Sequence, residues 1–240
     1  MRLLIAFLAL FVALPASAQL IEVPGRAPAP QTTDKENLWL LDLSTGGRVT
    51  ILLRPDVAPK MVERIKTLTR EHFYDGVVFH RVIEGFMAQS GDPKGDGTGG
   101  SSLPDLPKEF NYLPHVRGAV SAAREGAPER ATQEQKDKAE GSANSQFFIM
   151  FVPRLSLDQK YTVFGRVLEG MNWVDAIERG EPPANPTRIL RASIASDNPP
   201  PYAAPPPPAP PVLEPLPTLP AKKIAPAAKK PAAKAPATKK

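Results

Sequence analysis

The chain has 240 residues, no cysteine, 30 prolines and a formal net charge of +5. Without cysteine it forms no disulfide and no thiolate zinc site, and its three histidines lack the spacing of metal ligands, so we expect no metal and no cofactor. The Gly-x-Ser-x-Gly sequence of many hydrolases is also missing.

Residues 1–18 are typical of a secretory signal peptide. Arg2 precedes an apolar run over residues 3–14, and residues 16–18 give an Ala-Ser-Ala ending before Gln19. The run of about 12 residues is shorter than the roughly 20 that a spanning helix needs, which favours cleavage over a retained anchor. We therefore expect cleavage after Ala18 and export, with the bacterial periplasm as the destination.

A Pro-containing linker over residues 19–35 leads into residues 36–196, which have the length of one domain. In chain order, the patterns first predict strands at 38–43 and 48–53 joined by a hairpin, and then a helix from Pro59 to about His72. Short strands follow at 77–82, 86–90, 119–122, 146–150 and 162–168. A second helix at 171–178 and a strand at 188–194 complete the domain. Many short strands with Gly and Pro between them, and only two helices, indicate a mainly β barrel or sandwich.

Two segments inside this domain are expected to be loops. Residues 95–100 are rich in glycine but lack the Lys-Ser/Thr of a phosphate-binding loop, so we predict a flexible turn. Residues 124–141 are charged, and the part from Gln133 to Glu140 has no aliphatic side chain larger than alanine. Because this part has no apolar face to bury, we predict a surface insertion with at most a transient helix.

The C-terminal residues 197–240 are predicted to be a disordered Pro/Ala/Lys-rich tail. From Asn198 onward they hold half of the prolines. Their seven lysines and one acid, Glu214, contribute +6 to the net charge, which leaves a net charge of about −1 for the rest of the chain. Such a tail either binds an anionic cell-envelope surface or is only solubilising, and both readings stay open. With no aromatic residue beyond Tyr202, dedicated nucleic-acid binding is not expected.

Two apolar, strand-like runs carry polar side chains that a plain core would lack. Arg81 and Gln89 lie in the run at 79–91, which reads Phe-His-Arg-Val-Ile-Glu-Gly-Phe-Met-Ala-Gln-Ser-Gly, and Gln146 opens the run at 146–150. Polar groups within apolar strands need partners and therefore a reason. An apolar surface with a few fixed polar groups is typical of a ligand pocket.

In these two runs the chain resembles the cyclophilins, the peptidyl-prolyl cis/trans isomerases. The resemblance extends from about residue 38 to residue 194, and further blocks at 97–100, 118–121, 163–165 and 169–171 agree in order. It implies an eight-stranded antiparallel β-barrel capped by two α-helices, with a cleft on its outer face. It also implies a monomer that needs no cofactor and acts on Pro-containing unfolded or exported polypeptides to assist their folding.

The resemblance assigns roles to individual residues. Arg81 would be the catalytic guanidinium, and Gln89 would donate a hydrogen bond to the substrate backbone. The implied substrate-binding residues are Phe86, Met87, Phe147 and Leu157 around the proline, Tyr161 at the edge, His80 beside the site and Gln146 to orient Arg81. For the aromatic residues and the methionine, a plain core role is the alternative, because such side chains are usually buried.

Two departures from the family pattern bear on ligands. Ser156 stands where vertebrate-type enzymes have a tryptophan that contacts cyclosporin, so weak cyclosporin binding is expected. Arg124 and Glu125 replace small residues that usually contact the peptide through the backbone, which leaves open the preference for the residue before proline. A non-catalytic module that binds proline segments and is tethered to the envelope by its basic tail is the alternative function.

Overall fold

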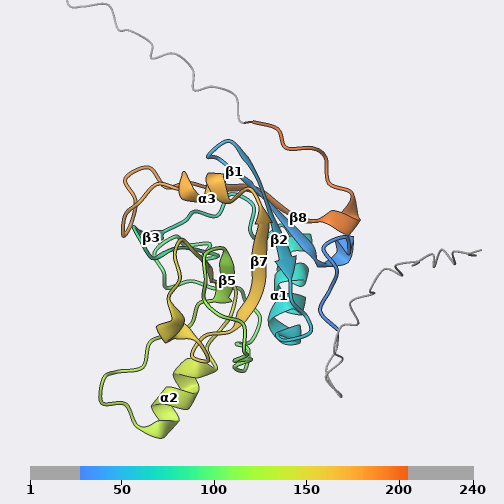
Figure 1. Ribbon diagram of the computed structural model, residues 1–240. Coiled ribbons are helices and arrows are strands. Elements are labelled where there is room, and N and C mark those ends of the chain that lie inside the picture. The colour runs from blue at the N-terminus through green and yellow to red at the C-terminus, as the bar shows by residue number, and fades with distance from the viewer. Residues whose placement is uncertain (1–27, 205–240) are drawn as a thin grey trace, which may run out of the picture. The chain divides into compact units, whose positions relative to one another are not determined.

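The computed structural model describes residues 28–204 (Figure 1). The predicted signal peptide, most of the predicted linker and most of the predicted tail lie outside the described residues. Eight strands form one antiparallel sheet: β1 (Leu38–Leu43), β2 (Gly47–Leu53), β3 (Arg81–Ile83), β4 (Met87–Ser90), β5 (Ala119–Ala122), β6 (Phe147–Met150), β7 (Val163–Glu169) and β8 (Ile189–Ile194). Their spatial order is β3-β4-β6-β5-β7-β2-β1-β8.

The two edges of this sheet, β3 and β8, are brought together by bonds between residues 76–79, just before β3, and residues 187–189 at the start of β8. Gly76 N donates to Ile189 O at 2.7 Å, Ile189 N to Val77 O at 2.9 Å, and Phe79 N to Thr187 O at 2.9 Å. These bonds curl the sheet back on itself, and the predicted eight-stranded antiparallel fold is confirmed.

Helix α1 (Pro59–Arg70) covers the core with Met61, Ile65 and Leu68, which are almost fully buried. Its N-cap, Ala58, has no capping side chain, but the carboxylate of Glu109 accepts hydrogen bonds from the backbone N–H groups of residues 60 and 61. A carboxylate there satisfies free N–H groups and complements the helix dipole. The long loop after β4 is thereby attached to α1.

The second predicted helix is the short α3 (Met171–Asp175), and a third helix, α2 (Gln133–Glu140), lies in the insertion (Figure 1). Thr132 and Gln135 form a reciprocal capping box at its start. Lys108 forms an ion pair with Glu140, with Nζ 2.6 Å from a carboxylate oxygen. A formed helix was not predicted here, because the segment has no apolar face; the capping box is the local signal that favours it.

Contacts of the barrel continue past the predicted end of the domain at residue 196. Arg48 Nη2 donates to Pro200 O at 2.8 Å, and the Tyr202 hydroxyl donates to Leu43 O at 3.2 Å. Arg48 and Arg191 are also paired with the buried Asp42. The start of the Pro-rich segment is therefore attached to β1, β2 and β8. Within residues 28–204, no helix is both long and apolar enough to cross a membrane.

Glycines at left-handed positions give a test of this packing. Gly170 (φ +82°) precedes α3, and a Cβ there would overlap the backbone carbonyl of Arg48, whereas Gly76 (φ +80°) has open space around it. We expect Gly76→Ala to lower the free energy of unfolding by about 1 kcal/mol and Gly170→Ala by about 2–4 kcal/mol, because only the second adds a clash to the strain of the backbone. Urea denaturation measures both, and equal losses would contradict this packing.

Candidate active site

The register of three neighbouring strands places Arg81, Gln89 and Phe148 in one row. Arg81 in β3 is opposite Gln89 in β4, and Gln89 is opposite Phe148 in β6. Residues that are directly opposite in an antiparallel pair point to the same face of the sheet. One cation, one amide and one aromatic ring therefore meet on the outer face.

A hollow of about 200 Å³ lies at this row. It is lined by Arg81, Phe86, Met87, Gln89, Ala123, Arg124, Phe148, Leu157 and Tyr161. Sites for drug-sized ligands usually enclose about 300–1,000 Å³, so this hollow is smaller than such a site. Its size suits a single apolar side chain. We call it the apolar pocket. Six residues predicted for the site are in this lining: Arg81, Gln89, Phe86, Met87, Leu157 and Tyr161.

Phe147 does not line the apolar pocket. It is fully buried in the barrel interior, with its ring centroid 5.0 Å from that of Trp39 and 5.9 Å from that of Tyr74. Phe148, the next residue, packs with Met87 in a separate cluster on the outer face. Successive side chains of a strand point to opposite faces, so the prediction for Phe147 is wrong and the wall of the pocket is Phe148.

A chain of hydrogen bonds links Arg81 to Gln146. Arg81 Nη1 donates to Gln89 Oε1 at 3.4 Å, and Gln89 Nε2 donates to Gln146 Oε1 at 2.9 Å. Gln146 Nε2 in turn donates to the backbone oxygens of Gly97 and Gly99, at 3.0 and 2.8 Å. Gln146 therefore contacts Arg81 only through Gln89, and it also holds the glycine-rich loop.

The glycine-rich loop at 95–100, predicted as a turn, is held by hydrogen bonds within the protein and does not form a phosphate cradle. The carboxylate of Asp92, which is fully buried, accepts hydrogen bonds from the backbone N–H groups of Lys94, Asp96 and Gly97. Asn144 Oδ1 accepts the N–H of Ser101 at 2.9 Å. Because these N–H groups already have acceptors inside the protein, they are not available to a phosphate.

Two histidines lie behind the site. His80 is buried below the loop at Gly97, and this burial lowers its pKa and favours the neutral ring. His115 was not predicted. Its ring is stacked on Phe148 with a centroid distance of 6.1 Å, and its Nδ1 lies 2.8 Å from Asp158 Oδ1. Burial lowers the pKa of His115 as well, although Asp158 opposes this shift. His115 thus supports the wall of the pocket from behind.

Two further arginines cover aromatic rings of the apolar pocket. The guanidinium carbon of Arg124 lies 4.6 Å from the ring centroid of Tyr161, and that of Arg154 lies 5.1 Å from the ring centroid of Phe86. Arg124 also lines a second, larger hollow, which it shares with Gln89 and Ala123. Arg124, one of the residues that depart from the family pattern, therefore lies on the boundary between the two hollows.

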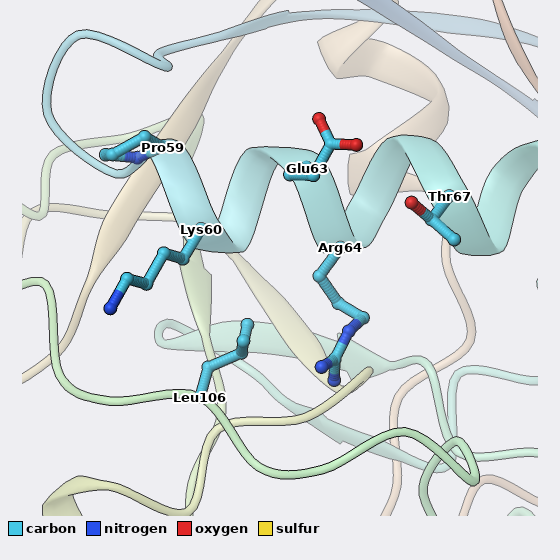
Figure 2. A pocket seen from close by; sticks show the side chains of 6 residues that line it. All are labelled: Pro59, Lys60, Glu63, Arg64, Thr67 and Leu106. Carbon is cyan, nitrogen blue, oxygen red and sulfur yellow. The ribbon is translucent and has the colours of Figure 1, made fainter.

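Another hollow, on the surface of α1, does not have the features of an active site. Figure 2 shows Lys60, Glu63, Arg64 and Thr67 of α1 above Leu106. Arg64 is 8% exposed, and its Nη2 donates to Pro104 O at 2.7 Å, which anchors the loop at 103–109 to the helix. This hollow is a wide and open surface depression. Within the part of the chain that the structure describes, no group of three or more His, Cys, Asp or Glu side chains could hold a metal ion.

Comparison with known proteins settles the family. The sequence model of the family of cyclophilin type peptidyl-prolyl cis-trans isomerases matches residues 40–194, which is more than half of the chain. The chain belongs to the cyclophilin family. It is similar to a probable peptidyl-prolyl cis-trans isomerase of Brucella suis, with 44% identity over 201 residues, 77% of this chain and 96% of that protein. Peptidyl-prolyl isomerase is thus the enzyme class of this cyclophilin.

Solved structures give the same family. A cyclophilin of Hirschia baltica matches with a TM-score of 0.59 and 28% identity, over 68% of this chain and 76% of that one. A cyclophilin type isomerase of Cryptosporidium parvum matches with a TM-score of 0.58 and 25% identity, over 66% and 96% of the two chains. Among the relatives found by sequence, a larger isomerase of Arabidopsis thaliana is 36% identical. The aligned part is 75% of this chain and 28% of that protein.

Substitution of the two neighbouring phenylalanines separates the pocket from the core. We expect Phe148→Ala to lower kcat/KM on a short X-Pro peptide by about 10- to 100-fold, because the proline loses one wall of the pocket. We expect Phe147→Ala to lower the free energy of unfolding by about 3–5 kcal/mol and to keep near-normal activity per folded molecule. Activity is corrected for the folded fraction from circular dichroism, and the reverse pattern would restore the assignment of Phe147 to the pocket.

Proposed function

We propose that this cyclophilin binds the proline ring of an X-Pro segment in the apolar pocket and that Arg81 stabilises the twisted transition state. The single observation that carries the proposal is that Arg81 lines the same pocket as the apolar side chains of Phe86, Met87, Phe148 and Leu157. Apolar walls and one oriented cation are the two groups that this reaction needs.

The chemistry follows from the electronic structure of the amide. Rotation about an X-Pro bond has a barrier of about 18–20 kcal/mol, because the planar amide is stabilised by resonance. In the twisted state this resonance is lost, charge separation falls, and the proline nitrogen becomes a better hydrogen-bond acceptor. An apolar pocket binds this less polar state better than the planar amide, and an N–H of Arg81 donates to it, so the transition state is bound more tightly than the ground state.

Gln89 is proposed to donate to the substrate backbone. Its Nε2 donates to Gln146 in the structure, and an amide nitrogen has a second N–H for a peptide carbonyl. Gln89 also accepts from Arg81, so one side chain joins the catalytic arginine to the backbone of the bound peptide.

The role of Arg81 is tested by Arg81→Ala and Arg81→Lys, with the cis-to-trans rate of a short X-Pro peptide as the readout. We expect Arg81→Ala to lower kcat/KM by about 10²–10³-fold, in the range for removal of one transition-state donor. Arg81→Lys should be intermediate, because an ammonium keeps the charge but not the planar fork.

The same experiment decides between an enzyme and a binding module. Full acceleration by folded Arg81→Ala would remove the arginine from the mechanism. A folded wild-type protein that binds the peptide without accelerating its isomerisation would support the non-catalytic proline-binding module instead.

We further propose that the enzyme is exported and that its basic tail holds it at an anionic cell-envelope surface. The supporting observations are sequence features, the signal-like residues 1–18 and the seven lysines after Asn198, and both lie outside the described residues. Isomerisation of prolines is a slow folding step, so polypeptides that fold after export are suitable substrates.

Fractionation of a bacterium that expresses the full chain tests this second proposal, with a chain that stops at residue 204, after the contacts of Pro200 and Tyr202 with the barrel, as the control. We expect a periplasmic protein with the mass of residues 19–240, which pellets with envelope material more than the shortened chain does, because the lysines are attracted to anionic groups. A cytoplasmic protein of full mass would contradict export, and equal pelleting would contradict the tether.

A further inference from the structure

Arg81 is held from a second side by a carboxylate outside the apolar pocket. Arg81 Nε donates to Glu181 Oε2 at 2.8 Å, while Arg81 Nη1 donates to Gln89 Oε1 at 3.4 Å. Glu181 lies in the segment between α3 and β8 and is not among the residues that line the pocket. The guanidinium therefore donates through Nε to an acid and through Nη1 to an amide.

The backbone fixes Glu181 at this place. Gly180 and Val82 exchange two hydrogen bonds, of 2.8 and 2.9 Å, and Val82 is the residue that follows Arg81. Gly180 has φ +147°, and an added Cβ there would lie 2.6 Å from Pro183 Cα, so the turn is tight. The ion pair is thus formed between two segments that are already joined by their backbones.

We infer that Glu181 is a positioning residue for the catalytic arginine, an inference that rests on the proposed function of Arg81. The bond from Arg81 to Gln89 is long, and a free arginine side chain has many rotamers. The carboxylate fixes the plane of the guanidinium and leaves Nη2, which has no hydrogen bond to another described residue, free to face a bound peptide. Since Glu181 lies outside the pocket lining, it orients Arg81 without occupying the place of the proline.

An effect of Glu181 on the charge of Arg81 and an effect on its position would change the rate in opposite directions. If the carboxylate mainly weakened Arg81 by neutralising its charge, removal of the carboxylate would raise the rate of isomerisation. Positioning predicts the reverse, and it acts on kcat more than on KM, because the arginine acts in the transition state while the apolar walls bind the ground state.

Glu181→Gln, Glu181→Ala and Glu181→Asp form the test series, with Glu84→Gln as the matched control. Glu84 forms an ion pair with Arg179 at 2.7 Å, also at the surface, and neither residue of this pair is among those that line the pocket. We expect Glu181→Gln and Glu181→Ala to lower kcat about two- to fivefold with little change in KM, as suits a partly exposed ion pair. Glu181→Asp should recover part of the loss, and Glu84→Gln should match the wild type.

A double-mutant cycle separates positioning from a general structural effect. In the Arg81→Ala background, Glu181→Gln should cause no further loss, because the group that it positions is gone. An equal loss in both backgrounds, an unchanged kcat or a raised kcat in Glu181→Gln would overturn the inference. The proposed function fails in a different way, namely when Arg81→Ala alone has the wild-type rate.

Discussion

The site depends on the antiparallel register of β3, β4 and β6. Arg81, Gln89 and Phe148 share one row because each is opposite the next, and their neighbours Val82, Ala88 and Phe147 all turn into the barrel. A shift of one residue in this pairing would put the arginine in the core and an interior aromatic ring at the surface. The apolar interior resists such a shift, so core packing and active-site geometry are the same constraint.

A second layer of contacts keeps the polar groups of the row in place. Gln146 joins Gln89 to the glycine-rich loop, and Asp92 accepts two backbone N–H groups of that loop and one from Lys94 just before it. Glu109 attaches the loop that follows to α1. The contacts of Gln146 and Glu109 connect segments far apart in the sequence, whereas those of Asp92 are local. These contacts support Arg81 and Gln89 from outside their own strands.

The barrel was largely predictable, because strands and helices of this chain have clear hydrophobic periods. The strands β1 and β5 lie where the pattern placed them, and Arg81 and Gln89 stood out as polar groups in apolar runs. Phe148 was also within reach of the sequence, since Gln146 was predicted for the cleft on the outer face and the period of two places residue 148 on the same face. The predicted Phe147 came from the family resemblance without this check.

Other features depend on long-range contacts that no local pattern shows. His115 stacks on Phe148 across 33 positions of the chain, and Glu181 reaches Arg81 across 100. The helix α2 had a local signal in the capping box of Thr132 and Gln135, but its charged composition pointed to a loop. The central residues of the site could therefore be predicted from the sequence, while the residues that support them are known only from tertiary contacts.

A crystal structure of the protein with a short X-Pro peptide tests the central claim most directly. The account predicts the proline ring in the apolar pocket, in contact with Phe148 and Met87, with an N–H of Arg81 within hydrogen-bond distance of the proline amide. Peptide bound in the hollow beside α1, or in the pocket with Arg81 turned away from the amide, would contradict it.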